Sequence, residues 1–227
     1  HMYMPVSYAG PVEDYEKLLN GVQLWDVGVE RQVQIKGPDA EALSQFLTPR
    51  NIKKCSIGQA MYTPLTDFQG GLLSDPVMLR IAEDCYWFSI SDGDLLLWVQ
   101  AIAAGYKFDV IVNEPDVSPL QTQGPNSTKL MAKVFGDWVN DLAFYRFKEI
   151  THAGIPLVIA RMGYSKELCY EIFLQDHTRG DELWEMLWEA GQDLNVSSGG
   201  PNMILRLEGG IVSYLSDIDR TNNPYEV

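Results

Sequence analysis

The sequence has few of the residues from which metal centres and disulfide frameworks are built. Three cysteines and three histidines are spread over 227 residues, without the spacing of a metal-binding motif. An odd number of widely separated cysteines favours a cytoplasmic setting over a structural disulfide. A Gly-x-x-x-x-Gly-Lys loop, a Gly-x-Gly-x-x-Gly turn after a strand and a Ser-His-Asp set are also missing. The sequence therefore predicts no metal site and none of these common centres.

Positive charge and long apolar runs are scarce as well. The 17 lysine and arginine residues face 31 aspartate and glutamate residues, which gives a net charge of −14 at pH 7. Nucleic acids and anionic membranes attract basic surfaces, so neither is an expected partner. No apolar run approaches the roughly 18 residues of a membrane helix, and the N-terminus lacks the features of a signal peptide. What remains is the composition of a globular protein, with 46% hydrophobic residues.

Strand-like and helix-like runs are interspersed along the chain. Alternation in "RQVQIKG" places Val33 and Ile35 on one face of a strand, and the spacing of apolar residues in "TRGDELWEMLWEAG" predicts an amphipathic helix. The expected strands are residues 31–37, 60–67, 75–81, 85–91, 107–112, 143–150, 155–162 and 169–175. The expected helices are residues 37–48, 92–105 with Asp92 near its cap, and 178–191. Residues 117–136 are expected to form a strand, a turn and a helix that Gly136 closes.

Some side chains have a predicted orientation or role within these elements. Phe46 should face inward with its apolar neighbours on the first helix, and Thr178 with Asp181 fits a capping box. Ile204 and Leu207 belong to an apolar stripe near the end of the chain.

Two stretches follow the same pattern. "QIKGPDAEALSQF" and "QTQGPNSTKLMAK" each contain a strand, a Gly-Pro step and a leucine at the same distance. The repetition predicts two related α/β units, with a junction near residue 115.

Two carboxylates stand out because apolar residues surround them. Glu171 lies within "CYEIFL", where alternation places it on one face with Cys169 and Phe173. A buried carboxylate needs a specific partner, or it must sit at the solvent edge. Asp75 follows a Gly-Gly turn, where it is either a strand-end cap or a functional acid. Arg206 lies on the last apolar segment, either in a structural ion pair or in a binding site.

Three separated blocks, "YTPLTDFQGGLLSDPVMLRI", "RMGYSKELCYEIFL" and "LRLEGGIVSYLSDIDRTNNPYE", resemble signature blocks of the folate-dependent aminomethyltransferases, the glycine-cleavage T-protein family. Further stretches, such as "VQLWDVGVERQVQIKGPDA", are most similar to dimethylsulfoniopropionate demethylase-like members of that family. The resemblance implies an α/β (α+β) fold in which residues 1–227 form a folate-binding domain of two related antiparallel-sheet and helix units. The family's C-terminal domain would be absent from the sequence.

The resemblance also implies roles for individual residues. It implies that Asp75 is catalytic, that Glu171 binds the pterin, that Tyr62 and Tyr164 line the folate site, and that Arg206 bonds folate or holds the site together. A carboxylate suits a pterin because the ring N–H and the adjacent amino group form a donor pair.

The implied activity is transfer of a methyl group from a small methylated donor to N5 of tetrahydrofolate, which serves as the methyl acceptor. Tyr62 and Trp25 are plausible walls for a cationic donor, since ring faces attract cations. The alternatives are a glycine-cleavage-type aminomethyltransferase, an aromatic O-demethylase and a non-catalytic folate-binding protein.

One block departs from the demethylase pattern. Where those proteins carry Gly-Trp-Ser-Lys-Gln-Gly-Gly, this chain has "GYSKELC". Tyr164 offers a smaller ring face than tryptophan, and Glu167 adds an anion unless Lys166 neutralises it. Leu168 and Cys169 bring side chains where two glycines allow close backbone approach. These changes predict a donor other than dimethylsulfoniopropionate itself.

Overall fold

The computed structural model describes residues 3–90 and 93–226, which divide into two compact units. One unit comprises residues 30–115 and 212–226, and the other comprises residues 3–29 and 116–211. Each unit combines a mainly antiparallel sheet with helices, so the expected mixed fold class is confirmed. Among the described residues, no helix has the length and apolar character needed to cross a membrane.

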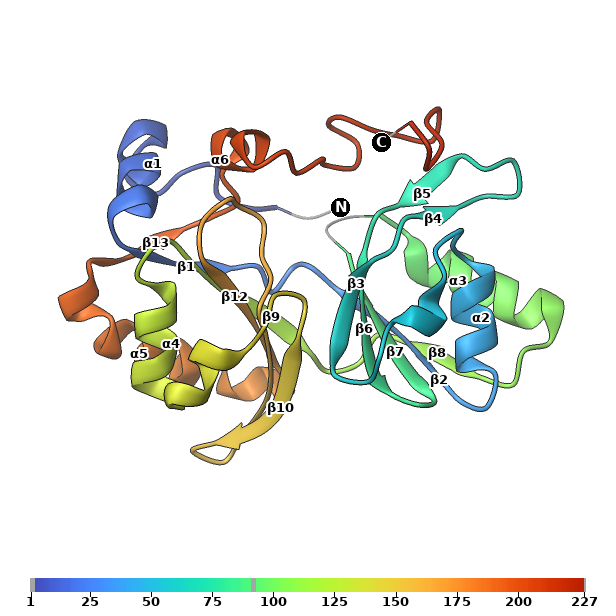
Figure 1. The fold of residues 1–227 in the computed structure, drawn as a ribbon, viewed down its shortest axis with the longest axis horizontal. Helices are drawn as coiled ribbons and strands as arrows, with labels where there is room; N and C mark the ends of the chain where they lie inside the picture. The colour runs from blue at the N-terminus through green and yellow to red at the C-terminus, as the bar shows by residue number, and fades with distance from the viewer. Residues whose placement is uncertain (1–2, 91–92, 227) are drawn as a thin grey trace. The chain divides into compact units, whose positions relative to one another are not determined.

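The first unit is built on a five-stranded antiparallel sheet in the order β3-β6-β7-β2-β8. Its strands are β2 (Gln32–Lys36), β3 (Gln59–Tyr62), β6 (Val77–Ala82), β7 (Cys85–Ser89) and β8 (Ile111–Asn113). Helices α2 (Ala40–Phe46) and α3 (Leu95–Tyr106) belong to this unit (Figure 1). They contribute Leu43 and Val99 to a core with Val33 and Ile35 of β2. The predicted orientation of Val33 and Ile35 is therefore confirmed. A short hairpin of β4 (Leu65–Thr66) and β5 (Leu72–Ser74) completes the unit with the 3-10 helix η1 (Ile52–Lys54).

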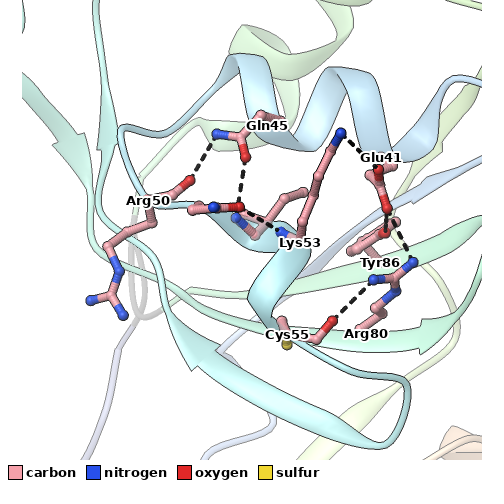
Figure 2. Close-up of polar contacts among 9 residues, drawn as sticks. Glu41, Gln45, Arg50, Lys53, Cys55, Arg80 and Tyr86 are labelled. Carbon is pink, nitrogen blue, oxygen red and sulfur yellow. Dashed lines mark hydrogen bonds and ion pairs between the residues drawn. The ribbon is translucent and has the colours of Figure 1, made fainter.

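A polar cluster fastens α2 to the sheet of this unit. Glu41 on α2 accepts a hydrogen bond from Arg80 Nη2 of β6 at 3.1 Å and lies 3.5 Å from the Tyr86 hydroxyl of β7 (Figure 2). Lys53 Nζ reaches the other Glu41 oxygen at 4.0 Å, and Arg80 Nη1 donates to the Cys55 carbonyl at 3.0 Å. The Glu41 carboxylate is therefore matched by two cations and a hydroxyl.

The second unit is built on a six-stranded sheet in the order β10-β11-β12-β9-β1-β13. Its strands are β1 (Val22–Asp26), β9 (Ser118–Gln123), β10 (Phe147–His152), β11 (Ile155–Ala160), β12 (Cys169–Leu174) and β13 (Val196–Gly199). All neighbours are antiparallel except the β1–β13 pair. Helices α4 (Ser127–Phe135) and α5 (Gly180–Ala190) cover one face, and residues of α1 (Pro11–Asn20) and α6 (Met203–Glu208) pack on the other (Figure 1). Short 3-10 helices η2 (Asp137–Asp141), η3 (His177–Arg179) and η4 (Gln192–Leu194) lie in its connections.

Strand β12 is buried along its whole length. Tyr170, Ile172 and Leu174 belong to the core beneath α4 and α5. By the two-residue repeat of a strand, Cys169 and Glu171 face the opposite side of the sheet. The structure therefore places Glu171 within a strand enclosed on both faces.

Several local predictions differ from the structure. The Phe46 side chain is 45% exposed, because it packs on the rings of Tyr106 and Phe108 instead of entering the core. Thr178 does not cap α5, since it lies in η3, where Asp176 accepts its backbone N–H.

The ends of two other elements also differ. Strand β8 begins at Ile111 and not at Lys107, because Lys107 closes α3 in the left-handed conformation, with φ 58°. On α6, Ile204 and Leu207 are exposed, whereas Leu205 between them is buried. The predicted apolar stripe is therefore not buried at Ile204 and Leu207. The helix starts at Met203, capped by the Asn202 side chain. The predicted cap at Asp92 lies outside the described residues.

Candidate functional site

The residues predicted for the site lie in both units, and each unit presents its own group. Tyr62 and Asp75 belong to the first unit. The second unit holds Trp25, Tyr164, Glu171 and Arg206.

In the first unit the structure brings Asp75 and Tyr62 together. Tyr62 ends β3 and Asp75 follows β5, and the Tyr62 hydroxyl donates to Asp75 Oδ2 at 3.1 Å. Burial raises the pKa of Asp75 to about 6, while the hydrogen bond from Tyr62 acts in the opposite direction. The carboxyl group is therefore mostly ionised at neutral pH and can stabilise a positive charge that develops beside it.

The segment 212–226 returns along β5 of the same unit. Tyr214 donates to the Leu72 carbonyl at 2.9 Å, and Leu72 N–H donates to the Asn222 carbonyl at 3.0 Å. Asp75 is among the acidic groups that raise the pKa of Tyr214, although burial is the larger cause. Sequence analysis did not single out Tyr214, which lies in "SYLSD", residues 213–217, within the last of the three resembling blocks. Leu215 in that segment has φ 69°, a conformation that favours glycine.

In the second unit, Glu171 is a buried carboxylate with a neutral partner. Its side chain lies across from Gln121 of β9 and Ala160 of β11, and the residue is 8% exposed. Gln121 Nε2 donates to Glu171 Oε1 at 2.9 Å. No ion pair found among the described residues involves this carboxylate. Burial therefore raises the pKa of Glu171 to about 7.

A chain of buried amides continues from this carboxylate. Gln123 Nε2 donates to Gln121 Oε1 at 2.8 Å, and Ser165 Oγ donates to Gln123 Oε1 at 2.7 Å. Sequence analysis missed both glutamines. The signal was available in "LQTQ", where two polar residues two positions apart must share one face of the strand. Their partner was not identifiable, because strand register is not written in the sequence of one strand.

Trp25 lies on the same sheet face, directly across β9 from Glu171. It pairs with Gln121 in the strand register, is fully buried, and donates from Nε1 to Gln23 Oε1 at 2.9 Å. It packs in a small core with Leu205, against which Tyr164 is partly buried. The structure thus brings Trp25 and Tyr164 together. Because the Trp25 ring is enclosed, its contact with a substrate stays a prediction that burial does not favour.

Arg206 and Lys166 make contacts within the second unit. Arg206 is 2% exposed and donates from Nη1 to the Ile211 carbonyl at 3.0 Å, which supports the turn after α6. Lys166 Nζ forms an ion pair with Glu208 of α6. Neutralisation of Glu167 by Lys166 was the exception to the predicted effect of Glu167, and the contact with Glu208 does not favour that exception.

Metal and thiol chemistry find little support in the described part of the chain. Within it, no group of three histidine, cysteine, aspartate or glutamate side chains is arranged to hold a metal ion. The three cysteines are buried. Burial raises the pKa of Cys169 to about 12, so its thiol is not a ready nucleophile.

Comparison with known proteins identifies relatives of this chain. The chain is 46% identical to dimethylsulfoniopropionate demethylase DmdA of Ruegeria pomeroyi, covering 100% of this chain and 62% of that protein. It is 31% identical to an aminomethyltransferase of Halothermothrix orenii, covering 98% and 63%.

The fold agrees with the sequence relatives. The structure matches the glycine cleavage system aminomethyltransferase T of Bartonella henselae with a TM-score of 0.85 and 25% identity, covering 97% of this chain and 60% of that one. The chain thus spans about three fifths of the length of each of these three proteins. Residues 1–227 match the GCVT N-terminal domain, and the chain belongs to that family.

Proposed function

We propose that this protein is a tetrahydrofolate-dependent methyltransferase that moves a methyl group from a small methylated donor to N5 of tetrahydrofolate. The observation that carries the proposal is Glu171, a buried carboxylate on a sheet strand whose hydrogen-bond partner is neutral. Such a carboxylate is costly to keep unless a ligand uses it. In this proposal residues 1–227 form the folate-binding domain, with a junction near residue 115.

The chemistry of Glu171 fits a pterin. One oxygen accepts from Gln121, and the carboxylate has further lone pairs for two parallel donors. A pterin presents a ring N–H beside an amino group, so an ionised Glu171 would accept from both. Tyr164 and Arg206 are proposed to line and support the folate site.

Asp75 is proposed as the catalytic carboxylate. Bound tetrahydrofolate supplies a nucleophilic nitrogen, which gains positive charge as it takes the methyl group. The Asp75 anion, held by Tyr62 at 3.1 Å, would stabilise that charge. The remaining task of the protein is alignment of nucleophile, methyl and leaving group, which contributes on the order of 7–11 kcal/mol in the best intramolecular reactions.

A second candidate is aminomethyl transfer of the glycine-cleavage type. The relative from Halothermothrix orenii favours it by name. Against it stands Ser74-Asp75, because the resemblance to the T-proteins implies two acidic residues there and this chain has one. The higher identity to the demethylase, 46% against 31%, also favours methyl transfer.

The activity is tested by single-turnover reactions of the full-length protein with tetrahydrofolate and a panel of sulfonium, ammonium and ether donors. Mass spectrometry separates 5-methyltetrahydrofolate from 5,10-methylenetetrahydrofolate. We expect the 5-methyl product. The methylene product would support the aminomethyl reaction instead, and folate binding without any product would support a non-catalytic binder. The three buried thiols suit a reducing compartment, so we place the reaction in the cytoplasm.

A further inference from the structure

The hydrogen-bonded chain beside Glu171 has a direction that its charged end sets. An ionised carboxylate only accepts hydrogen bonds, so Gln121 must turn its amide NH2 group toward Glu171. The Gln121 carbonyl oxygen then faces Gln123, which must donate in turn. The Gln123 carbonyl oxygen accepts from the Ser165 hydroxyl. In each of these three hydrogen bonds, the donor therefore points toward Glu171.

The three hydrogen-bonded side chains of Gln121, Gln123 and Ser165 are buried within the protein. The exposed fractions are 2% for Gln121, 0% for Gln123 and 8% for Ser165. Each amide is bonded at both ends, which offsets the cost of burying it. In a region of low dielectric, aligned hydrogen bonds also strengthen one another. A network placed only to fill space would be cheaper with apolar side chains, so its polarity needs another explanation.

The backbone at Gly163 passes close to the side chain of Gln123. A Cβ atom added at Gly163 would lie 2.5 Å from Gln123 Nε2 and 2.7 Å from the Cβ atom of Cys169. Glycine is therefore required where the loop passes Gln123. Two residues later the same loop supplies Ser165, whose Oγ also accepts the Glu167 N–H at 3.2 Å. The loop thus presents one hydroxyl in one orientation.

We propose that Ser165, Gln123 and Gln121 are positioning residues that orient the Glu171 carboxylate and favour its charged form, so that it accepts the donor pair of a pterin. The inference rests on the proposed function, in which Glu171 holds the ligand. Gln121 acts directly on the carboxylate, while Gln123 and Ser165 act through Gln121. Loss of any one leaves the next residue without its donor.

Four variants separate positioning from simple stability. Gln121→Met keeps the length of the side chain and removes its donor. Ser165→Ala removes the first donor, and Ser165→Thr restores the hydroxyl. Gln23→Met is the matched control, because Gln23 is buried on the same sheet face but bonds Trp25 and the Asp14 carbonyl.

The first measurement needs no ligand. Glutamate carboxyl carbons of the full-length protein are labelled with carbon-13 and titrated by NMR, and Glu171 is assigned by its loss in Glu171→Gln. Without a donor the charged form is less favoured, so Gln121→Met should raise the pKa of Glu171 by about one unit. Ser165→Ala should raise it by less, and Ser165→Thr and Gln23→Met should leave it at the wild-type value.

Neighbouring groups do not confuse this titration. Burial raises the pKa of the adjacent Cys169 thiol to about 12, well above the range in which Glu171 titrates. The thiol therefore keeps its charge state between about pH 5 and about pH 9, a range of about two units on each side of the Glu171 pKa of about 7.

The second measurement is calorimetry with tetrahydrofolate across the same pH range. Affinity should fall as pH drops through the pKa of Glu171. In Gln121→Met the fall should begin at higher pH, and the affinity at neutral pH should be roughly tenfold lower. An unmoved pKa of Glu171 in Gln121→Met would overturn the inference, as would weaker binding by the same factor at every pH. If Gln121→Met raises the pKa of Glu171 but the wild-type protein does not bind tetrahydrofolate, the positioning role is supported and the proposed function is overturned.

Discussion

Glu41 and Glu171 are carboxylates that the two units treat in opposite ways. Glu41 is contacted by Arg80 at 3.1 Å and by Lys53 at 4.0 Å, with the Tyr86 hydroxyl beside it (Figure 2). Glu171 is more deeply buried, and its partner is the neutral amide of Gln121. Cations compensate the charge of Glu41, whereas the charge of Glu171 lacks such compensation and its pKa rises to about 7.

The difference separates a carboxylate that holds a fold together from one that, in the proposed function, binds a ligand. Ion pairs satisfy Glu41 within the protein, so nothing further is gained by a ligand there. A neutral donor leaves Glu171 with acceptor capacity and with an unfavourable burial energy that a ligand can offset. Asp75 belongs with Glu171, since its partner is the Tyr62 hydroxyl and burial raises its pKa to about 6.

The largest expected effect is on stability at alkaline pH. The pKa of Glu171 is raised from 4.5 to about 7 in the folded protein, so the folded state binds the proton more tightly than the unfolded state. Stability should therefore fall as pH rises from about 4.5 through 7, by about 3 kcal/mol at most. Glu171→Gln removes this loss and should be the more stable protein at pH 8 by up to about that amount. Urea unfolding at pH 5 and pH 8 measures the difference.

Glu41→Gln is the control for that experiment. Its carboxylate has cationic partners, so no comparable gain at high pH is expected. Parallel pH profiles for the two variants would show that the two carboxylates do not differ as described.

A comparable effect is expected on catalysis at Asp75. Asparagine keeps the size of the side chain and removes its charge, so Asp75→Asn should lower kcat about 100-fold, which corresponds to about 2.7 kcal/mol. Folate affinity should stay within a few-fold of wild type, because the charge matters most as the folate nitrogen becomes positive. Steady-state kinetics and calorimetry on the full-length protein measure both. Unchanged kcat with a raised KM would make Asp75 a binding residue.

A smaller effect is expected in the Glu41 cluster. Removing this charge turns the ion pair with Arg80, whose side chain is 15% exposed, into a neutral hydrogen bond at best, while the bond from Arg80 to the Cys55 carbonyl stays (Figure 2). Because Glu41 is itself partly exposed, the cost of Glu41→Gln should be about 1 kcal/mol. Chemical denaturation at neutral pH measures it, and tetrahydrofolate affinity should not change. A loss of affinity would contradict the division between structural and ligand-binding carboxylates.

The smallest effect concerns the donor. Glu167 adds a negative charge beside "GYS", and Lys166 is engaged by Glu208. Glu167→Gln should therefore raise kcat/KM for the carboxylate-bearing dimethylsulfoniopropionate by a few-fold relative to a donor without a carboxylate. If the wild-type protein prefers dimethylsulfoniopropionate over every other donor, the substitutions in this loop are tolerated and the expectation of a different donor is wrong.

The sequence predicted the elements better than their edges and partners. Alternation in "CYEIFL" correctly placed Glu171 on one face of β12, because a two-residue repeat is a local property of a strand. It gave no sign of Gln121, since pairing of β9 with β12 joins residues 50 positions apart. Phe46 was placed in the core by helical spacing, yet its aromatic partners come from the end of α3 and the following turn. Long-range contacts decide such details.

Calorimetry of tetrahydrofolate binding to wild type, Glu171→Ala and Glu41→Ala at neutral pH tests the proposed role of Glu171 most directly. The Glu171→Ala variant loses a charged hydrogen-bonding partner for the ligand. Its affinity for tetrahydrofolate should therefore be roughly ten- to a hundredfold lower, which corresponds to about 1.5–3 kcal/mol. Glu41→Ala should bind as the wild type does. Equal affinities for wild type and Glu171→Ala would contradict the account, because they would remove Glu171 from the folate site.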